Sequence, residues 1–342
     1  MELLTISIEF FLDTGYGIGS VSIKKSLLVK KVSYMHVMFS NKKNVSVLLA
    51  SCNGSKYIEA QLESIFNQTY PVKEVIIKDD CSVDNTCMIV QNFIRENQLQ
   101  DTWKLIRNEN NQGWKKNFVD GLNYVHGDYI LFCDQDDIWN EYKIEKILKQ
   151  FELNSEIELI ATNYNIFKSD SSKSWVKSQD KVDGTVSKYN AQKRFLYVLY
   201  PGCTYCFKKE LLHLYKEFWE EIIPHDAFVW HFALIRGSLY IYNEKLINYR
   251  RHENTVTGRT INNKAERLKD IEYLLVILRY YKENDGYYSC HKRYIDEAEK
   301  WLTNRCRGLS GEARFSILKN YKYISYYWSW KTFIMDVFLT FI

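Results

Sequence analysis

Three aspartates close together are the residues of this sequence with the clearest potential for chemistry. Asp134, Asp136 and Asp137 follow an apolar run that starts at Ile130 and is typical of a buried strand. Because side chains alternate along an extended strand, we expect Asp134 and Asp136 to point the same way and to share one divalent cation. Carboxylate oxygens are ligands for hard cations such as Mg²⁺ or Mn²⁺. An isolated aspartate pair with this spacing is more commonly a solvated acidic turn, so the surrounding elements decide between the two interpretations.

The segments before the aspartates alternate between strand and helix patterns. Residues 45–50 are a continuous apolar run, residues 58–66 repeat apolar side chains at helical spacing, and residues 74–77 form a second apolar run. Further elements are expected as a helix at 86–96, a strand at 103–107 and a helix at 115–125. This order predicts an α/β fold with a mostly parallel sheet.

Polar residues follow three of the expected strands. They occupy residues 51–54 after the first strand, residues 79–82 after the second, and the aspartates after Cys133. In open parallel sheets, ligands bind beyond the carboxyl ends of the strands. We therefore expect these three clusters to lie together around one site.

Composition narrows the class of protein. The 342 residues carry a net charge of +4 and are 46% hydrophobic, and no nucleic-acid-binding motif is present, so a nucleic-acid partner is not expected. The eight cysteines lack the density of a disulfide scaffold and are interpreted as reduced, which predicts a cytoplasmic protein. Cys203 and Cys206 form a CxxC pair without a second pair at zinc spacing and are interpreted as core thiols in a short strand at 203–207.

Three regions are expected along the chain. Residues 1–40 fit no later pattern and are interpreted as an uncertain N-terminal extension, without the basic start of a signal peptide. Residues 41–262 are the expected catalytic domain, with further short strands at 159–164 and 239–242. Residues 263–342 are expected to be helical, basic and aromatic, starting with a helix at 264–283, and no window is apolar over the roughly 18 residues that a membrane span needs.

Seven sequence blocks in one order resemble the family 2 glycosyltransferases. They are VSVLLASCNGSKYIEAQLESIFNQTYP, VIIKDDCSVDNT, NQGWKKNF, GDYILFCDQDDIW, PGCTYCF, HDAFVW and YRRHENTVTG. The likeness covers roughly residues 44–258 and is strongest to bacterial enzymes that extend surface polysaccharides, including rhamnosyltransferase-like members. It implies the GT-A fold, a Rossmann-like nucleotide-sugar-binding domain, followed here by the helical region.

The resemblance assigns donor-binding roles near the first two strands. Asp80 matches the acidic residue that contacts the nucleobase, with Asp79 beside it, and a carboxylate can accept the N3 proton of uracil or thymine. Capping of the following helix is the alternative role for Asp80. Ala50 and Asn53 are expected beside the base, Ala50 through its backbone.

The resemblance also implies the diphosphate and metal contacts. Asp134 and Asp136 match the DxD motif that holds the ribose and a Mn²⁺ or Mg²⁺ ion, with Gln135 among the donor-binding residues. His252 matches a histidine that completes the metal's coordination. Other basic side chains are weaker candidates for phosphate contacts, and these are Lys115, Lys116, Arg250 and Arg251.

Asp226 matches the family's catalytic base, which takes the proton of the acceptor hydroxyl as that oxygen attacks the anomeric carbon and inverts it. Capping of a helix is the alternative role, and the two are compatible. Near the acceptor and sugar pocket, His225 is expected to bond to or tune the base, with Asp137 as a further candidate. Trp139 and Trp230 are expected either to floor the sugar sites or to be core residues.

The sequence thus predicts a metal-dependent inverting glycosyltransferase of the hexosyl-transferring class. It would move one sugar from a UDP- or dTDP-linked donor to a hydroxyl of a growing capsule or O-antigen type polysaccharide. The processive QxxRW block is missing, and the basic, aromatic C-terminal region is expected either to rest on the inner membrane leaflet, near lipid-linked acceptors, or to pack within the protein or on a second subunit. Two alternatives stay open: a nucleotidyltransferase, although SCNGSKY has only one glycine, and a non-catalytic carbohydrate-binding scaffold of the same fold.

Overall fold

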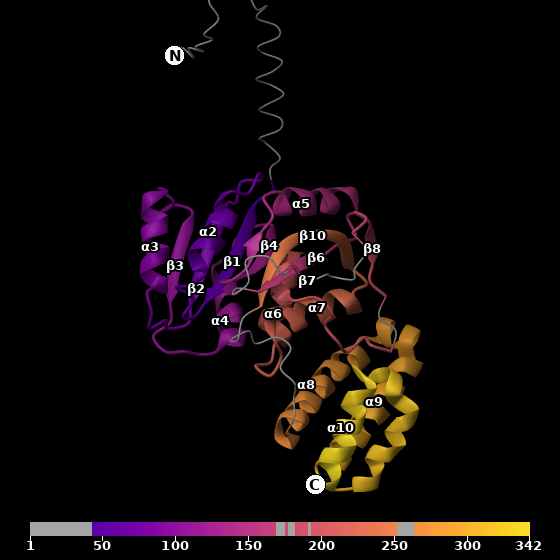
Figure 1. Cartoon of the computed structure of the whole chain (residues 1–342). Helices are drawn as coiled ribbons and strands as arrows, with labels where there is room; N and C mark the ends of the chain where they lie inside the picture. Colours follow the sequence, from indigo (N-terminus) through magenta and orange to yellow (C-terminus); the bar gives the residue numbers. More distant parts are fainter. Residues whose placement is uncertain (1–42, 169–174, 177–181, 191–192, 252–262) are drawn as a thin grey trace, which may run out of the picture. The chain divides into compact units, whose positions relative to one another are not determined.

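One large sheet organises the chain. The computed structural model describes residues 43–168, 175–176, 182–190, 193–251 and 263–342. In these residues ten strands form a sheet of order β3-β2-β1-β4-β9-β6-β10-β5, with β7 beside β6 and β8 beside β10 (Figure 1). The strands are β1 (Val45–Ser51), β2 (Glu74–Asp79), β3 (Trp103–Arg107), β4 (Tyr129–Asp134), β5 (Ile138–Trp139), β6 (Leu159–Lys168), β7 (Trp175–Val176), β8 (Val186–Lys188), β9 (Tyr205–Lys208) and β10 (Leu239–Arg251).

The first four strands of the order are parallel. In register, Ala50 of β1 lies between Lys78 of β2 and Asp134 of β4. Because all four run the same way, their polar carboxyl-terminal residues reach one edge of the sheet. The predicted α/β fold with a mostly parallel central sheet is therefore confirmed in this half, whereas β9 pairs antiparallel with both β4 and β6.

Helices cover both faces of the sheet. Val45, Val47 and Leu49 of β1 pack on one face with α2, α3 and α5, while Leu48 packs on the other with α4, α7 and the C-terminal helices. This explains why β1 is mostly apolar: its residues alternate between two packed layers, and even its two serines, Ser46 and Ser51, are buried. The helices of the catalytic part are α2 (Ile58–Phe66), α3 (Thr86–Glu96), α4 (Trp114–Gly121), α5 (Lys143–Leu153), α6 (Leu212–Phe218) and α7 (His225–Ile235), with 3₁₀ turns η1 (Leu122–Tyr124), η2 (Gly202–Thr204) and η3 (Lys209–Leu211).

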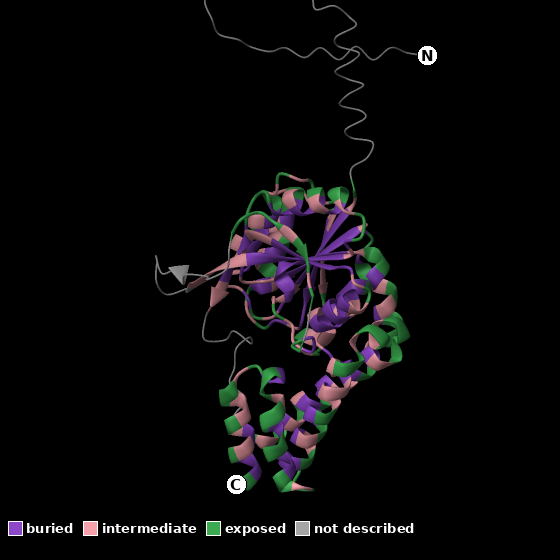
Figure 2. Ribbon diagram, turned by 90° about the vertical axis from the view of Figure 1, so that its right-hand side faces the viewer, coloured by how far each residue is buried: buried purple, intermediate pink, exposed green. Residues whose placement is uncertain are grey.

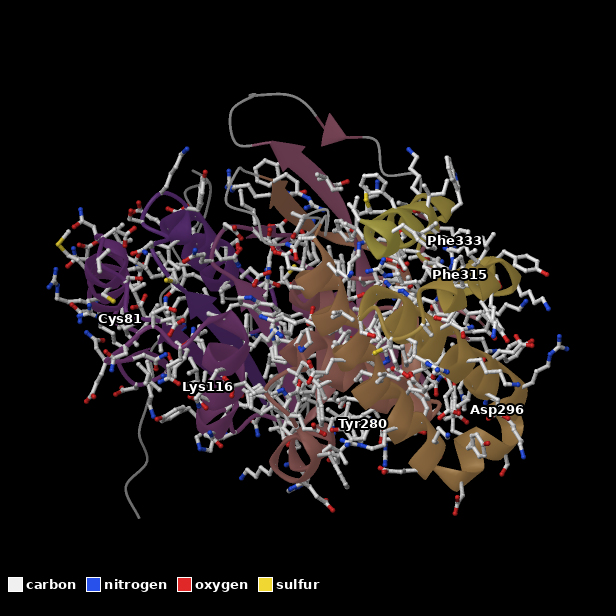
Figure 3. All side chains as sticks on the ribbon, turned by 90° about the horizontal axis from the view of Figure 1, so that it is seen from below. Cys81, Lys116, Tyr280, Asp296, Phe315 and Phe333 are labelled. Atoms are coloured by element: carbon white, nitrogen blue, oxygen red, sulfur yellow. The ribbon has the colours of Figure 1, made fainter. Side chains whose placement is uncertain are left out.

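The C-terminal part consists of helices only. It contains α8 (Lys264–Glu283), α9 (Asp285–Leu309), the 3₁₀ segment η4 (Arg314–Tyr326) and α10 (Trp330–Phe341). Hydrogen bonds connect it to the catalytic part, including those from Tyr281 to the carbonyl of Phe195 and from Tyr280 to that of Phe218; Figures 2 and 3 show these helices beside the sheet, with Tyr280 labelled. Within the described residues, no helix has the length and apolar character needed to cross a bilayer.

Most expected elements are confirmed, several at their expected bounds. The helices at 86–96 and 264–283 and the strand at 103–107 match α3, α8 and β3. The strand expected at 203–207 begins only at Tyr205, because residues 202–204 form a 3₁₀ turn. Residues 43–342 form one compact unit, so the division at residue 262 stays a prediction, and the expectation for residues 1–40 concerns residues outside the described ranges.

Candidate active site

The loops after β1 and β2 are bonded to each other. The Ser51 hydroxyl donates to Asp79 Oδ2 over 2.8 Å, and the Asn53 N–H donates to Ser82 Oγ over 2.8 Å. Asn53 Oδ1 in turn accepts from the N–H of Val83 at 2.9 Å. Asn53 has a positive φ of 49°, a conformation that asparagine tolerates better than most residues. The expected meeting of the first two polar clusters is therefore confirmed.

The loop after β4 joins the same group through Gln135. Its side-chain Oε1 accepts from the N–H of Cys52 at 2.9 Å, while its Nε2 donates to the Cys52 carbonyl at 3.0 Å. A Cβ atom at Gly54 would lie 2.1 Å from Gln135 Oε1, so only glycine permits this approach. Gln135 thus fixes the β1 loop against the acidic segment, and its expected contact with a donor stays a prediction.

Asp80 holds the loop that precedes α4. Its Oδ1 accepts from Asn108 Nδ2 and from the N–H of Gln112, both at 2.8 Å, and its Oδ2 accepts from the N–H of Gly113 at 2.8 Å. Asp80 is buried, and the amide of Asn108 also contacts the buried ammonium of Lys78. The nucleobase contact expected of Asp80 stays a prediction, and a base could use only the remaining acceptor capacity of Oδ2.

The acidic segment differs from its expected geometry. Strand β4 ends at Asp134 and residues 135–136 form a turn, so the alternation that was to align Asp134 with Asp136 is wrong. The turn instead brings one ligand atom each of Asp134, Asp137 and Cys203 within 4.8 Å of one another. Asp136 lies close enough for its charge to raise the pKa of both other aspartates. Its role as a metal ligand stays a prediction, and His252 lies outside the described residues.

The charges of this cluster are poorly compensated by the protein. Burial, followed by the charges of Asp136 and Asp226, raises the pKa of Asp134 to about 7. Burial raises the pKa of the fully buried Asp137 well above its usual range, against the opposing effects of hydrogen bonds from the N–H of Arg250, to Oδ1 at 2.9 Å, and from the Cys203 thiol. The other carboxylate oxygen, Oδ2, has no partner within hydrogen-bond distance. A buried carboxylate oxygen without a donor is costly, so this donor set fits a divalent cation.

A buried lysine that sequence reasoning missed lies beneath the cluster. Lys143 begins α5, is fully buried, and donates to the carbonyl of Cys203 over 2.9 Å. Its ammonium lies 3.5 Å from the ring centroid of Trp139, and burial lowers its pKa to about 8. Sequence patterns gave no signal for this role, since lysines on surface helices are usually solvated.

Asp226 lies in the first turn of α7, with Pro224 rather than Asp226 as the helix cap. Its Oδ1 accepts from the N–H of Ala227 at 2.8 Å, and its Cβ lies 2.7 Å from where a Cβ of Gly202 would be. Burial raises the pKa of Asp226, against the opposing effects of backbone hydrogen bonds from Ala227 and Gly202 and of the Lys115 charge. A raised pKa suits a group that must accept a proton. The role of Asp226 as the base stays a prediction, whereas its role as the helix cap is wrong.

Three aromatic residues expected near the sugar are core residues. His225 stacks on Phe118 with ring centroids 3.8 Å apart, burial lowers its pKa to about 3, so it is neutral, and its Nδ1 has no hydrogen-bond partner. Trp230 is fully buried and stacks on Tyr205. Trp139 is also buried, under Lys143. The core alternative for the two tryptophans is therefore confirmed, whereas the tuning role of His225 stays a prediction.

The expected phosphate contacts have other partners. Lys115 donates to the carbonyl of Ile222 over 2.8 Å, in the loop before α7. Lys116 of α4, labelled in Figure 3, pairs with Asp120. Arg250 Nε donates to the Asp136 carbonyl at 2.6 Å, and its guanidinium lies 4.6 Å from the ring centroid of Tyr57. Arg250 thus holds the acidic turn from β10, a role that its motif did not indicate.

The cysteines are all free thiols in the structure. Cys203 and Cys206 are buried, as expected for core thiols, but Cys203 also belongs to the group around Asp134 and Asp137. Its thiol therefore has a second role that the CxxC spacing did not reveal.

Comparison with known proteins agrees with this geometry. A family model described as "Glycosyl transferase family 2" matches residues 46–213. The dTDP-rhamnosyl transferase RfbG of Shigella flexneri is 34% identical over 236 residues, which cover 64% of this chain and 76% of RfbG. The GalNAc(5)-diNAcBac-PP-undecaprenol beta-1,3-glucosyltransferase of Campylobacter jejuni is 28% identical over 270 residues, which cover 73% of this chain and 84% of that enzyme.

A solved structure shares the fold. The structure of S. aureus TarS 1–349 in complex with UDP-GlcNAc superposes with a TM-score of 0.58 at 20% sequence identity, covering 86% of this chain and 81% of that one. The sheet, its acidic edge and the similarity to RfbG lead to one assignment: this chain belongs to the family 2 glycosyltransferases and is a rhamnosyltransferase-like enzyme of bacterial polysaccharide biosynthesis.

Proposed function

We propose that this enzyme is a metal-dependent inverting glycosyltransferase that moves a single sugar from a UDP- or dTDP-linked donor to a hydroxyl of a growing cell-surface polysaccharide. The acceptor is a glycan or a lipid-linked glycan at the cytoplasmic face of the membrane. The name of RfbG, a dTDP-rhamnosyl transferase, supports the dTDP form of the donor, and the undecaprenol-linked name of the Campylobacter jejuni relative supports a lipid-linked acceptor.

One observation carries the proposal: the turn η2 joins the proposed base, Asp226, to the acidic cluster. Gly202 packs directly against Asp226, and the next residue, Cys203, lies with Asp134 and Asp137. The charge of Asp226 raises the pKa of Asp134, so the two carboxylates are neighbours. An inverting displacement of a diphosphate requires a base on one side of the anomeric carbon and, on the other, positive charge against the leaving group, which a cation held by the carboxylate cluster would supply.

The side chains divide the work as follows. Asp134, Asp136 and Asp137 are the candidates to hold a Mn²⁺ or Mg²⁺ ion, which when bound supplies positive charge opposite the diphosphate leaving group. Asp226 takes the acceptor's proton, and its raised pKa brings its basicity closer to neutral pH. Lys115 holds the loop before α7 through the Ile222 carbonyl and so fixes the direction of the base.

The first test is binding and hydrolysis of UDP-, dTDP- and GDP-sugars with Mn²⁺, with Mg²⁺ and with EDTA. We expect selection of one nucleotide sugar in the presence of metal, and its loss in the Asp136→Ala variant. A protein that binds no nucleotide sugar with either metal would contradict the proposal and favour a non-catalytic role for this fold.

The second test separates catalysis from binding. Asp226→Asn keeps the shape of the side chain and the hydrogen bond from Ala227 but cannot accept a proton, so we expect sugar transfer to fall by about 10² to 10⁴ with an unchanged donor dissociation constant. The exposed Asp101→Asn serves as the control. Equal transfer rates in Asp226→Asn and wild type would exclude Asp226 as the base.

A further inference from the structure

The outer surface of the last two helical segments is apolar. Ten large hydrophobic side chains between residues 315 and 342 are exposed, and we call them the C-terminal apolar surface: Phe315, Leu318, Tyr321, Ile324, Trp328, Trp330, Ile334, Phe338, Phe341 and Ile342. Phe315 and Ile342 are 75% and 79% exposed. Contiguous exposed apolar side chains on this scale mark a binding surface rather than an ordinary protein exterior.

The spacing of these residues places them in two stripes. Phe315, Leu318 and Tyr321 recur every third residue in η4, and side chains three apart share one face of a 3₁₀ helix. In α10, Trp330, Ile334 and Phe338 recur every fourth residue and share one face of an α-helix. The stripes adjoin, since the rings of Phe315 and Phe341 are 5.8 Å apart; Phe315 is labelled in Figure 3.

Helix α10 exposes several large apolar side chains while it buries its one acidic side chain. Its acidic residue, Asp336, is fully buried and bonded to Arg267 and to Arg305, the latter at 2.7 Å, while Trp330 and Phe338 on its outer face are each 59% exposed. A surface helix normally buries its apolar stripe and exposes its charges. The protein has therefore built an internal ion pair to anchor α10 with its apolar face outward.

The charges on this surface are of one sign. Between residues 313 and 342 the only acidic residue is Asp336, which is internally paired, whereas the basic residues are exposed: Arg314, Lys319, Lys322 and Lys331. A surface that combines Trp, Tyr and Phe with lysines and has no exposed acidic side chain between residues 313 and 342 complements the headgroup region of an anionic bilayer, where aromatic rings and basic side chains are favoured.

The dimensions exclude a spanning arrangement for these segments. Helix α10 has 12 residues, which at 1.5 Å per residue give about 18 Å, short of a hydrocarbon core of about 30 Å. A short helix with an outward apolar face and flanking basic residues lies in the plane of the interface.

We propose that η4 and α10 form a docking surface for an anionic membrane, with the C-terminal apolar surface inserted among the headgroups and Lys319 and Lys322 on the lipid phosphates. The inference rests on the proposed function in one respect: it explains how an enzyme with a lipid-linked acceptor would reach it. The surface itself is argued from exposure, spacing and charge alone.

Cosedimentation of the full chain with vesicles tests the surface. We expect binding to vesicles of phosphatidylcholine with one-third phosphatidylglycerol, weak binding to pure phosphatidylcholine, and weaker binding at high salt. Lys319→Gln with Lys322→Gln removes two charges worth about 1 kcal/mol each near the surface, so binding should weaken roughly 30-fold. Trp330→Ser with Phe338→Ser should weaken it at least about tenfold.

Matched controls separate this surface from nonspecific effects. Leu153→Ser removes an exposed apolar side chain at the end of α5 and should leave vesicle binding unchanged. Donor hydrolysis without vesicles should be unchanged in all these variants, which keeps a failed docking surface distinct from a failed transferase. The proposal is overturned if wild type does not bind anionic vesicles. It is also overturned if wild type forms a dimer that Trp330→Ser with Phe338→Ser dissociates while vesicle binding stays the same, and in that case the surface is a subunit interface.

Discussion

At the scale of single residues, the carboxylates of the site store unfavourable charge. Asp134 and Asp137 are held without a matching number of donors, and burial raises the pKa of both. The folded-state pKa of Asp134 is raised from 3.8 to about 7. Below pH 3.8 this carboxyl group does not lower the stability of the fold, because it is protonated in both states. As pH rises from 3.8 to about 7, it destabilises the fold increasingly. The carboxylates of the site therefore destabilise the fold most at the pH at which they are ionised and a cation would bind them.

This predicts a stability that depends on both pH and metal. In EDTA, we expect both the melting temperature and the free energy of unfolding to fall between pH 5.5 and pH 8. In Asp134→Asn, the fall in the free energy of unfolding should be smaller by roughly 1–3 kcal/mol, after allowance for partial solvent contact. Added Mn²⁺ should raise the melting temperature more at pH 8 than at pH 5.5, because protons compete with the ion. A Mn²⁺ effect that is equal at the two pH values would contradict this account.

His225 predicts the opposite pH dependence. Its pKa is lowered from 6.5 to about 3, so the folded state resists protonation and loses stability as pH falls below 6.5. His225→Phe keeps the stacking on Phe118 and should reduce the loss of unfolding free energy between pH 7 and pH 5 by about 2 kcal/mol. Denaturant unfolding at the two pH values measures it, with the exposed His213→Phe as the control. An unchanged difference in His225→Phe would show that the buried imidazole does not limit acid stability.

At the scale of elements, the site depends on loops that bond to one another across the sheet edge. The side-chain amide of Gln135 forms two hydrogen bonds with the backbone of Cys52, and Asp80 accepts a hydrogen bond from the loop before α4. These contacts join segments about 30 to 80 residues apart in sequence, so the parallel order of β2, β1 and β4 is what makes them possible.

Gly54 tests this coupling. A methyl group at Gly54 would displace the flexible Gln135 side chain rather than the backbone, so Gly54→Ala should fold. Because Gln135 would no longer order the β1 loop, we expect the variant to bind its nucleotide-sugar donor about tenfold or more weakly, a loss of roughly 1.4 kcal/mol of binding free energy. Gly286→Ala, in the first turn of α9 and without a close neighbour, is the matched control and should leave binding unchanged. Calorimetric titration with the donor measures both. Equal affinities would show that Gln135 does not organise the donor site.

The elements also show what sequence patterns can and cannot predict. Period and breakers predicted α3 and β3 to the residue, because both are strongly patterned and clearly bounded. The end of β4 could not be predicted, because the sequence CDQDD does not indicate where the extended backbone ends. For this reason Asp136 was expected on the same strand as Asp134, whereas it lies in the following turn. The burial of Lys143 and His225 depends on packing between segments far apart in the chain, which local patterns do not contain.

At the scale of the whole molecule, one buried ion network holds the C-terminal helices together. Asp336 of α10 bonds to Arg267 of α8 and to Arg305 of α9, all three buried. Two arginines with one carboxylate leave positive charge inside, which the nearby Asp270 offsets in part.

Asp336→Asn should therefore be strongly destabilising. It leaves two buried guanidinium groups without their main counter-charge, and the expected loss is about 3–5 kcal/mol of unfolding free energy. Urea unfolding followed by tryptophan fluorescence measures it. Glu312→Gln, which breaks the exposed pair with Arg307, should cost less than about 1 kcal/mol. A similar, small loss in both variants would mean that the network does not hold α10 in place.

The lysine beneath the acidic cluster has a consequence for how this sequence varies across species. Inside the protein the ammonium of Lys143 is stabilised by the ring of Trp139, by the carbonyl of Cys203 and by the charge of Asp137. If a relative lost the indole of Trp139, the buried ammonium of Lys143 would lose one of its partners, and selection would favour a neutral side chain at position 143. Positions 139 and 143 should therefore covary in an alignment of relatives, with tryptophan and lysine kept or lost as a pair.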